Sequence, residues 1–124
     1  MTDASRAAIV RRCFDAYRTK DRASIEAVLA DDFRFTSPYD DAIDRATYFV
    51  RCWTNSGRIR QHDIERIFVQ GDSAYVTYLA HIVDGSEFRN TEFFTFRDDK
   101  ITSVTVYFGA SYRDGRFVAQ APPG

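Results

Sequence analysis

Apolar residues in the first thirty positions recur at helical spacing. A first helix is predicted over residues 3–18, where Asp3 or Ser5 can cap the start. Its apolar face carries Ile9, Val10, Cys13, Phe14 and Tyr17. A second, shorter helix is predicted over residues 22–30, capped by Asp21.

A short strand and a third helix follow. Phe33 and Phe35 alternate with polar residues as in a strand, and Pro38 ends the run. The third helix is predicted over residues 42–54, where large apolar side chains gather. Asp40 or Asp41 is expected to cap its start, and Asn55-Ser56-Gly57 stops it.

The second half of the chain changes to runs of β-branched and aromatic residues, which favour strands. Four strands are predicted over residues 62–69, 73–83, 87–96 and 101–108. The segments between them carry turn residues such as Asp84-Gly85, a strong hairpin signal. Helices followed by an antiparallel meander predict an α+β domain with a loop-like tail over residues 110–124.

Turn length fixes which residues face each other in a hairpin. Taking Asp84-Gly85 as a two-residue turn places Thr77 opposite Glu92, and a similar turn at Gly71-Asp72 places His62 opposite His81. One face of the sheet is then predicted to carry His62, Ile64, Arg66, Phe68, Tyr75, Thr77, Leu79, His81, Asn90, Glu92, Phe94, Phe96, Val104, Val106 and Phe108. The other face is predicted to carry Val76, Tyr78, Ala80, Ile82, Arg89, Thr91, Phe93, Thr105 and Tyr107.

Both predicted faces contain large apolar side chains, although an antiparallel sheet with one wet side alternates cleanly. Three helices can cover only one face. Because large exposed apolar patches usually mark interfaces, the sequence predicts a homodimer packed through the outer sheet face.

Composition narrows the class of protein. The chain of 124 residues is long enough for one domain, and 44% hydrophobic residues exclude disorder. A net charge of −1, from 17 basic and 18 acidic residues, gives no case for nucleic acid or an anionic membrane. No apolar run is long enough to span a bilayer, and the first residues lack signal-peptide architecture, so a cytoplasmic location is expected. Cys13 and Cys52 are expected to be free thiols.

Glu92 lies in the middle of the aromatic run RNTEFFTF, residues 89–96. A buried carboxylate without a partner is costly and shifts its pKa or finds a partner. Two placements are open: towards solvent or an interface, or into a cavity. Inside a cavity, Glu92 is either a functional acid or an ion-pair partner of Arg66.

Three stretches carry a family resemblance: IEAVLADDFRFTSP (residues 25–38), YFVRCW (48–53) and TEFFTFRDDKITSVTVYF (91–108). With the element order, they resemble the nuclear transport factor 2-like superfamily, in particular its SnoaL-like and ketosteroid-isomerase-like branch. The resemblance implies a single SnoaL-like domain over residues 1–124, with its core at about 5–110. It also implies a cone-shaped, cystatin-like fold in which three N-terminal helices pack on a strongly curved antiparallel sheet. Many members hold an apolar pocket and dimerise.

In ketosteroid isomerases a carboxylic acid on the penultimate strand is kept neutral by its apolar site and donates a hydrogen bond to the substrate oxyanion. Glu92 matches that position. The base of those enzymes, an acid before the proline, falls at Ser37, and their helix tyrosine falls at Cys13. The resemblance therefore stops short of the steroid-isomerase catalytic set. Arg66 with Glu92 is loosely similar to limonene epoxide hydrolases.

Two functions are predicted. One is acid–base catalysis on a small apolar molecule, of isomerase, cyclase or hydrolase type, with Glu92 as the acid and His81 or Tyr39 as the base. The other is a non-catalytic ligand-binding or accessory dimeric domain. The residues expected to line the ligand site are Phe33, Phe35, Trp53, Arg66, Thr77, Asn90, Phe94 and Phe108. His62, His81 and Glu92 leave a metal triad open as a less favoured alternative, and no metal or cofactor is expected.

Overall fold

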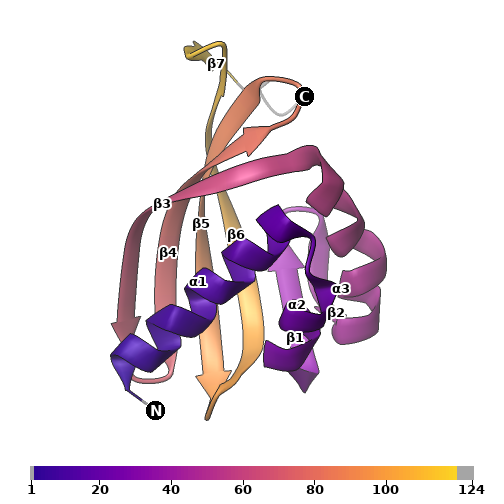
Figure 1. The fold of residues 1–124 in the computed structure, drawn as a ribbon, viewed down its shortest axis with the longest axis vertical. Coiled ribbons are helices and arrows are strands. Elements are labelled where there is room, and N and C mark those ends of the chain that lie inside the picture. Colours follow the sequence, from indigo (N-terminus) through magenta and orange to yellow (C-terminus); the bar gives the residue numbers. More distant parts are fainter. Residues whose placement is uncertain (1, 120–124) are drawn as a thin grey trace.

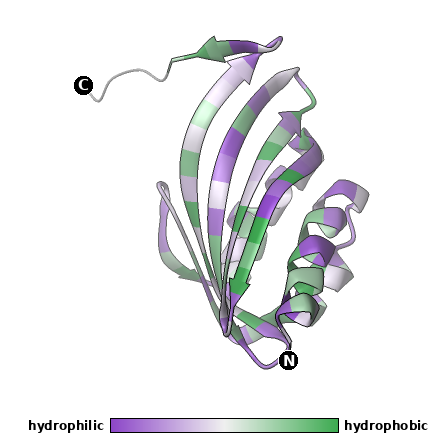
Figure 2. Ribbon diagram, turned by 90° about the vertical axis from the view of Figure 1, so that its left-hand side faces the viewer, coloured by the Kyte–Doolittle hydropathy of each residue, from purple (hydrophilic) through white to green (hydrophobic). Residues whose placement is uncertain are grey.

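The computed structural model describes residues 2–119, and its helices lie on the concave side of a curved sheet (Figures 1 and 2). The elements in chain order are α1 (Asp3–Thr19), α2 (Arg22–Val28), β1 (Leu29–Ser37), β2 (Asp40–Asp44), α3 (Arg45–Arg51), the 3-10 helix η1 (Trp53–Arg58), β3 (Ile59–Gln70), β4 (Ser73–Ile82), β5 (Ser86–Arg97), β6 (Lys100–Arg113) and β7 (Arg116–Val118). This α+β architecture with three helices on a curved, unclosed sheet confirms the predicted fold class.

Side-chain caps begin the three α-helices. Thr2, rather than the predicted Asp3 or Ser5, accepts a hydrogen bond from the Ser5 N–H at the start of α1. Asp21 caps α2 as predicted. The third helix begins later than predicted because residues 40–44 pair with β1 as strand β2. Its cap is therefore Asp44, not Asp40 or Asp41.

The sheet has the strand order β2-β1-β6-β5-β4-β3, and β7 pairs with the end of β6. The predicted antiparallel meander is confirmed for β3 to β6. The sheet as a whole is mixed rather than antiparallel, because β1 pairs with β6 in parallel. The prediction of a loop-like tail is wrong for residues 110–118, where β6 continues to Arg113 and β7 pairs with it. Residues 120–124 of that predicted tail lie outside the described residues.

The predicted register between β4 and β5 is wrong by one residue. Three residues, Val83 to Gly85, connect these strands instead of two, and the Gly85 N–H donates to the Ile82 carbonyl. Glu92 therefore pairs with Val76, and Thr77 pairs with Thr91. Because neighbouring residues of a strand point to opposite faces, this shift exchanges the two predicted sets of β4 side chains.

The predicted register between β3 and β4 is correct on one side of a bulge in β3 and wrong on the other. Arg66 pairs with Thr77, as predicted, but an extra residue between Ile64 and Arg66 shifts the pairing further along. His62 consequently pairs with Ala80 instead of His81. His62 shares the concave face with Glu92, whereas Arg66 lies on the convex face with Thr77.

A second bulge bends β5 against β6. The register shifts between Phe88 and Asn90, opposite Gly109. A Cβ atom at Gly109 would lie 2.5 Å from the Arg89 carbonyl oxygen, so only glycine permits this close approach. Beyond the bulge Asn90 pairs with Phe108 and Glu92 with Val106, which confirms the predicted facing set on β6.

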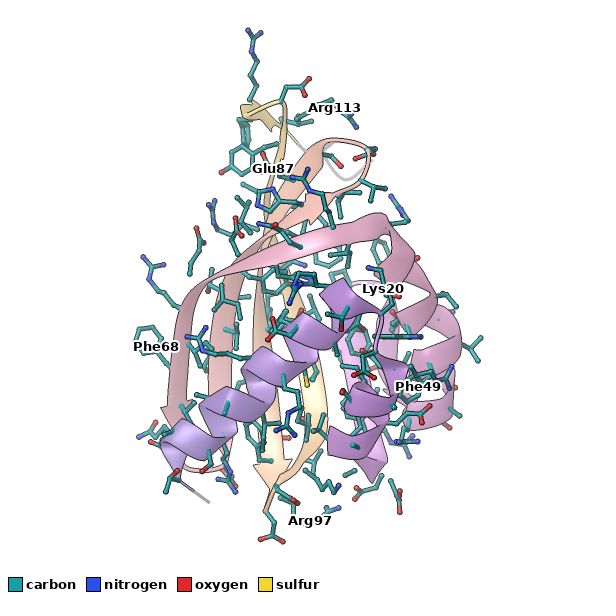
Figure 3. The ribbon with its side chains drawn as sticks, viewed as in Figure 1. Lys20, Phe49, Phe68, Glu87, Arg97 and Arg113 are labelled. Carbon is teal, nitrogen blue, oxygen red and sulfur yellow. The ribbon has the colours of Figure 1, made fainter. Side chains whose placement is uncertain are left out.

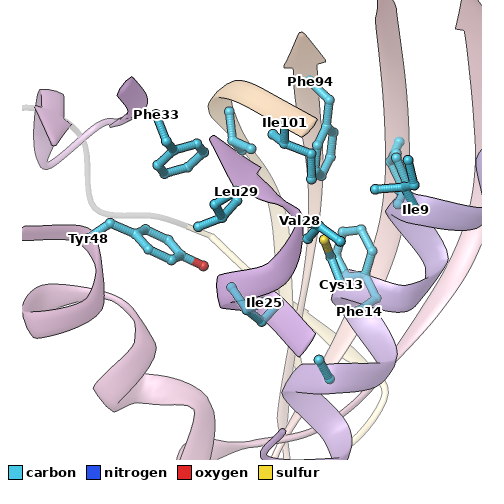
Figure 4. Close-up of a cluster of buried hydrophobic side chains, with 14 of the residues drawn as sticks. Ile9, Cys13, Phe14, Ile25, Val28, Leu29, Phe33, Tyr48, Phe94 and Ile101 are labelled. Atoms are coloured by element: carbon cyan, nitrogen blue, oxygen red, sulfur yellow. The ribbon is translucent and has the colours of Figure 1, made fainter. Parts of the chain in front are cut away.

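The core joins α1, α2, α3 and the concave face of the sheet (Figure 4). Phe33, Ile25 and Ile101 are almost completely buried there. Lys20, which follows α1, joins this helix to η1 and to the start of β3 (Figure 3). Its Nζ atom donates to the carbonyls of Tyr17 and Ser56, and to that of Ile59 at 2.9 Å. No helix within residues 2–119 has the length and apolar character needed to cross a membrane.

Candidate functional site

A cavity of about 460 Å³ lies between the concave face of the sheet and the helices. Most of its wall is aromatic or aliphatic. The predicted site residues that line it are Phe33, Phe35, Tyr39, Asn90, Glu92, Phe94 and Phe108. A cavity of this size, apolar with a few convergent polar groups, is typical of a small-molecule site.

Glu92 on β5 lines this cavity and is half-buried there. Its partners on the neighbouring strands are Val76, which is fully buried, and Val106. Burial raises the pKa of Glu92 from 4.5 to about 7, although a hydrogen bond from Tyr78 opposes the shift. Near neutral pH the protonated and the ionised forms of the carboxyl group are therefore both populated.

Tyr78 is the direct partner of Glu92, and the sequence prediction missed it. Its hydroxyl donates to Glu92 Oε2 at 2.5 Å and accepts from Asn90 Nδ2 at 3.3 Å. Burial raises the pKa of Tyr78 well above its ordinary value, so the phenol stays a neutral donor. The error of one residue at the β4–β5 connection had placed Tyr78 on the opposite face. A three-residue reading of Val83 to Gly85 would have found it.

A pair of tyrosine hydroxyls lines the cavity from the side of the helices. The hydroxyls of Tyr17 in α1 and Tyr48 in α3 form a hydrogen bond with each other. One bond uses one of the two hydroxyl hydrogens, and within residues 2–119 neither hydroxyl makes another hydrogen bond. One phenolic hydrogen is thus left to a ligand or to water. Trp53 is buried behind Tyr17, with the ring centroids 4.9 Å apart, and does not line the cavity.

His62 also lines the cavity, packed edge-on against Phe14 and Tyr78. Burial lowers the pKa of His62 from 6.5 to about 4, with the charge of Lys20 adding to the effect. The imidazole is therefore neutral at physiological pH and is a weak proton acceptor. Its Nδ1 is buried and has no hydrogen-bond partner within the described chain.

Three predicted site residues lie on the convex face, away from the cavity: Arg66, Thr77 and His81. The placement of His81 beside Glu92 is wrong. His81 instead contacts Asp63 through Nε2 at 2.6 Å and Glu87 through Nδ1 at 2.7 Å. The possible triad of His62, His81 and Glu92 is likewise wrong, because the two histidines occupy opposite faces. Residues 2–119 contain no group of three or more acidic, histidine or cysteine side chains arranged to hold a metal ion.

Tyr39 lies at the cavity mouth, in the turn between β1 and β2. It is 77% exposed, and its ring lies 5.6 Å from that of Phe108, which is 45% exposed. The two cysteines also reach the cavity and are free. Burial raises the pKa of Cys13 to about 12 and that of Cys52 to about 11, so both are unreactive thiols.

Comparison with protein families finds a match to the SnoaL-like domain over residues 10–104. A search of curated proteins finds no significant match. Similar solved structures include a candidate ketosteroid isomerase from Kribbella flavida (24% identity, 99% of this chain and 85% of that chain, TM-score 0.72). A candidate polyketide cyclase from Sinorhizobium meliloti is also similar (20% identity, 86% and 100%, TM-score 0.68). A third is an LEH-like epoxide hydrolase of M. tuberculosis (21% identity, 86% and 84%, TM-score 0.73). At these identities the likeness shows the fold alone.

The burial of Glu92 predicts a specific dependence of stability on pH. Its folded pKa of about 7 lies above the unfolded value of 4.5, so the protonated form favours folding. The contribution is complete below pH 4.5 and is lost as the pH rises through 7. Relative to Glu92→Gln, which does not ionise, the wild-type free energy of unfolding should fall by about 3 kcal/mol from about pH 4 to about pH 8.

Urea unfolding at several pH values measures this difference. Two curves of stability against pH that run parallel would show that the Glu92 carboxyl is not desolvated in the folded protein.

Proposed function

Since this chain belongs to the SnoaL-like family, we propose that its cavity binds a small, largely apolar molecule with one oxygen function and transfers a proton to it from Glu92. The observation that carries the proposal is the carboxyl group of raised pKa inside an apolar cavity. A group whose pKa lies near the working pH is the most effective general acid or base.

The ligand oxygen would lie against the Glu92 carboxyl. A neutral carboxylic acid donates a hydrogen bond to a carbonyl oxygen and stabilises negative charge that develops there. When Glu92 gives up its proton, the Tyr78 hydroxyl at 2.5 Å supports the carboxylate that remains. The spare hydroxyl hydrogen of the Tyr17–Tyr48 pair offers a further donor within the same space.

The reaction class is an isomerisation, a cyclisation or a hydrolysis, each of which can begin with proton donation to oxygen. Solved structures of this fold carry names of these three kinds, which supports the range but selects none of them. The second candidate is a ligand-binding domain without turnover. The weakly basic His62 favours it, because the histidine in the cavity wall cannot readily accept a proton at neutral pH.

Isophorone, a small apolar enone, tests the proposal as a probe. Isophorone should raise the melting temperature of the wild-type protein. In D₂O near neutral pH, the wild-type protein should also accelerate deuterium uptake at the acidic carbons of isophorone, which proton NMR measures. Glu92→Gln removes the transferable proton but keeps the side-chain volume. It should slow the enzyme-dependent uptake by about 100-fold or more.

Glu87→Gln serves as the matched control, because Glu87 lies on the same strand and contacts His81 on the convex face. It should leave uptake unchanged. Binding of isophorone without accelerated uptake would reject catalysis of this kind and favour the ligand-binding alternative. Equal uptake by wild type and Glu92→Gln would remove Glu92 from the chemistry.

A homodimer through the convex face is the second part of the proposal. Phe68, Tyr75 and Tyr107 on this face are 68%, 51% and 55% exposed. Tyr75 packs against Phe93 on the next strand at 4.7 Å between ring centroids, and Phe68 pairs with Tyr75 on its other side. Phe68 projects from the edge strand away from the rest of the molecule (Figure 3). Exposed apolar surface of this kind is typical of an interface between chains.

Tyr75→Glu tests the dimer. The residue is half exposed in the single chain, so the change should leave the fold intact, but it would bury a charge in the interface. Sedimentation velocity should show a dimer for the wild type and a monomer for the variant at micromolar concentration. A monomeric wild type, or a variant with an unaltered dimer, would contradict an interface on this face.

A further inference from the structure

Arg58 is the one lysine or arginine within residues 2–119 that lines the cavity. It is the last residue of η1, and it is exposed to solvent. A residue that is exposed and also lines the cavity lies at its opening. Because most of the cavity wall is apolar, this guanidinium gives one part of the opening a positive charge.

Hydrogen bonds hold the backbone around Arg58 in place. Its carbonyl accepts from the Val83 N–H at 2.9 Å, in the connection between β4 and β5. Lys20 Nζ donates to the carbonyls of Ser56 and Ile59, which bracket Arg58 in the chain. The guanidinium therefore extends from a fixed position, as a binding group on a rigid support does.

The guanidinium of Arg58 has no direct partner in the described part of the chain. The arginines that form ion pairs within residues 2–119 are Arg18, Arg22, Arg51, Arg89, Arg97 and Arg113. Arg58 is not one of them, and its side chain donates no hydrogen bond within the same residues. Its planar set of N–H donors is thus left to a ligand or to water.

The acid that responds to the charge of Arg58 is Asp84. Hydrogen bonds from Ser86 lower the pKa of Asp84, and the charges of Arg113 and Arg58 add to the effect. The Asp84 carboxylate is already engaged, because it accepts from the Ser86 N–H at 2.9 Å and lies 3.7 Å from Arg113. Two arginines act on one aspartate, so a surplus of one positive charge remains here.

Glu92 lies far from this charge. The six strand positions from Ser86 to Glu92 on β5 span roughly 20 Å. The start of β5 lies near Arg58, because Ser86 binds Asp84 and Val83 binds Arg58. A ligand that reaches both Glu92 and the Arg58 side chain is therefore elongated, with a polar group at each end and an apolar middle.

We propose that Arg58 is a specificity-determining residue that binds a carboxylate at one end of the ligand while the oxygen function at the other end lies against Glu92. The guanidinium fork fits the two oxygens of a carboxylate. A single surplus charge matches one carboxylate better than a phosphate monoester, which carries nearly two negative charges. The ligand class is then an elongated oxo acid. This inference rests on the proposed function and adds the second group that the ligand carries.

A matched pair of probes tests the role of Arg58. One probe is a cyclohexenone that carries a pentanoic acid chain on its β-carbon. The other is the corresponding primary amide, which is nearly equal in size and uncharged. Isothermal titration calorimetry at low salt should show that the wild type binds the acid about 5-fold more tightly than the amide. The preference should shrink at high salt, because salt screens exposed charges.

Three variants assign the preference to one side chain. Arg58→Met should bring the affinity ratio of acid to amide to about 1, and Arg58→Glu should make the amide the tighter ligand. Arg60→Met is the matched control, because Arg60 is exposed on β3 and does not line the cavity. It should keep the wild-type ratio. In deuterium exchange with the acid probe, Arg58→Met should raise the half-saturating concentration rather than lower the rate at saturation.

Equal wild-type affinities for the acid and the amide would overturn the role of Arg58 and leave the proposed function standing. A wild-type preference that persists in Arg58→Met, with the melting temperature of the unliganded variant showing that it is folded, would also overturn it. A wild type that binds isophorone but neither longer probe would overturn the elongated ligand class. A wild type that binds none of the three compounds would reject the proposed function, and this inference would fall with it.

Discussion

A carboxyl group on the concave face of a curved sheet is largely removed from bulk water, and the pKa of Glu92 is accordingly raised to about 7. Valines flank it on both neighbouring strands, and a single phenol, Tyr78, supplies its hydrogen bond. The other polar groups of the cavity are arranged around this carboxyl. Asn90 fixes Tyr78, and the Tyr17–Tyr48 pair leaves one hydrogen for the space that Glu92 faces.

The shape that desolvates Glu92 comes from irregular strand pairing. One bulge at Gly109 bends β5 against β6, and another between Ile64 and Arg66 bends β3 (Figure 2). The curve leaves a hollow that the helices close without filling. Because proteins of this fold differ in activity, the chemistry depends on which side chains enter the hollow, and the proposed proton transfer rests on Glu92.

Local sequence patterns predicted the three α-helices and the strands β1 and β3 to β6, because hydrophobic spacing and turn residues act over a few positions. They did not predict β2 or β7, and they left two placements of Glu92 open. The register between strands was harder to predict from the sequence. One extra residue at Val83 to Gly85 reversed the faces of β4, which hid Tyr78 and misplaced His81. Asp40 resembled a solvated helix cap because its burial depends on Arg51 and Ser37, contacts that form only after β2 pairs with β1.

The most direct measurement is the titration of the Glu92 carboxyl by ¹³C NMR on protein labelled at the glutamate side chains, with Glu92→Gln identifying the resonance. A midpoint near pH 7 is predicted, together with a further rise when isophorone fills the cavity and excludes water. A midpoint near 4.5, the ordinary value for glutamate, would show that the carboxyl is solvated and would contradict its role as a neutral acid.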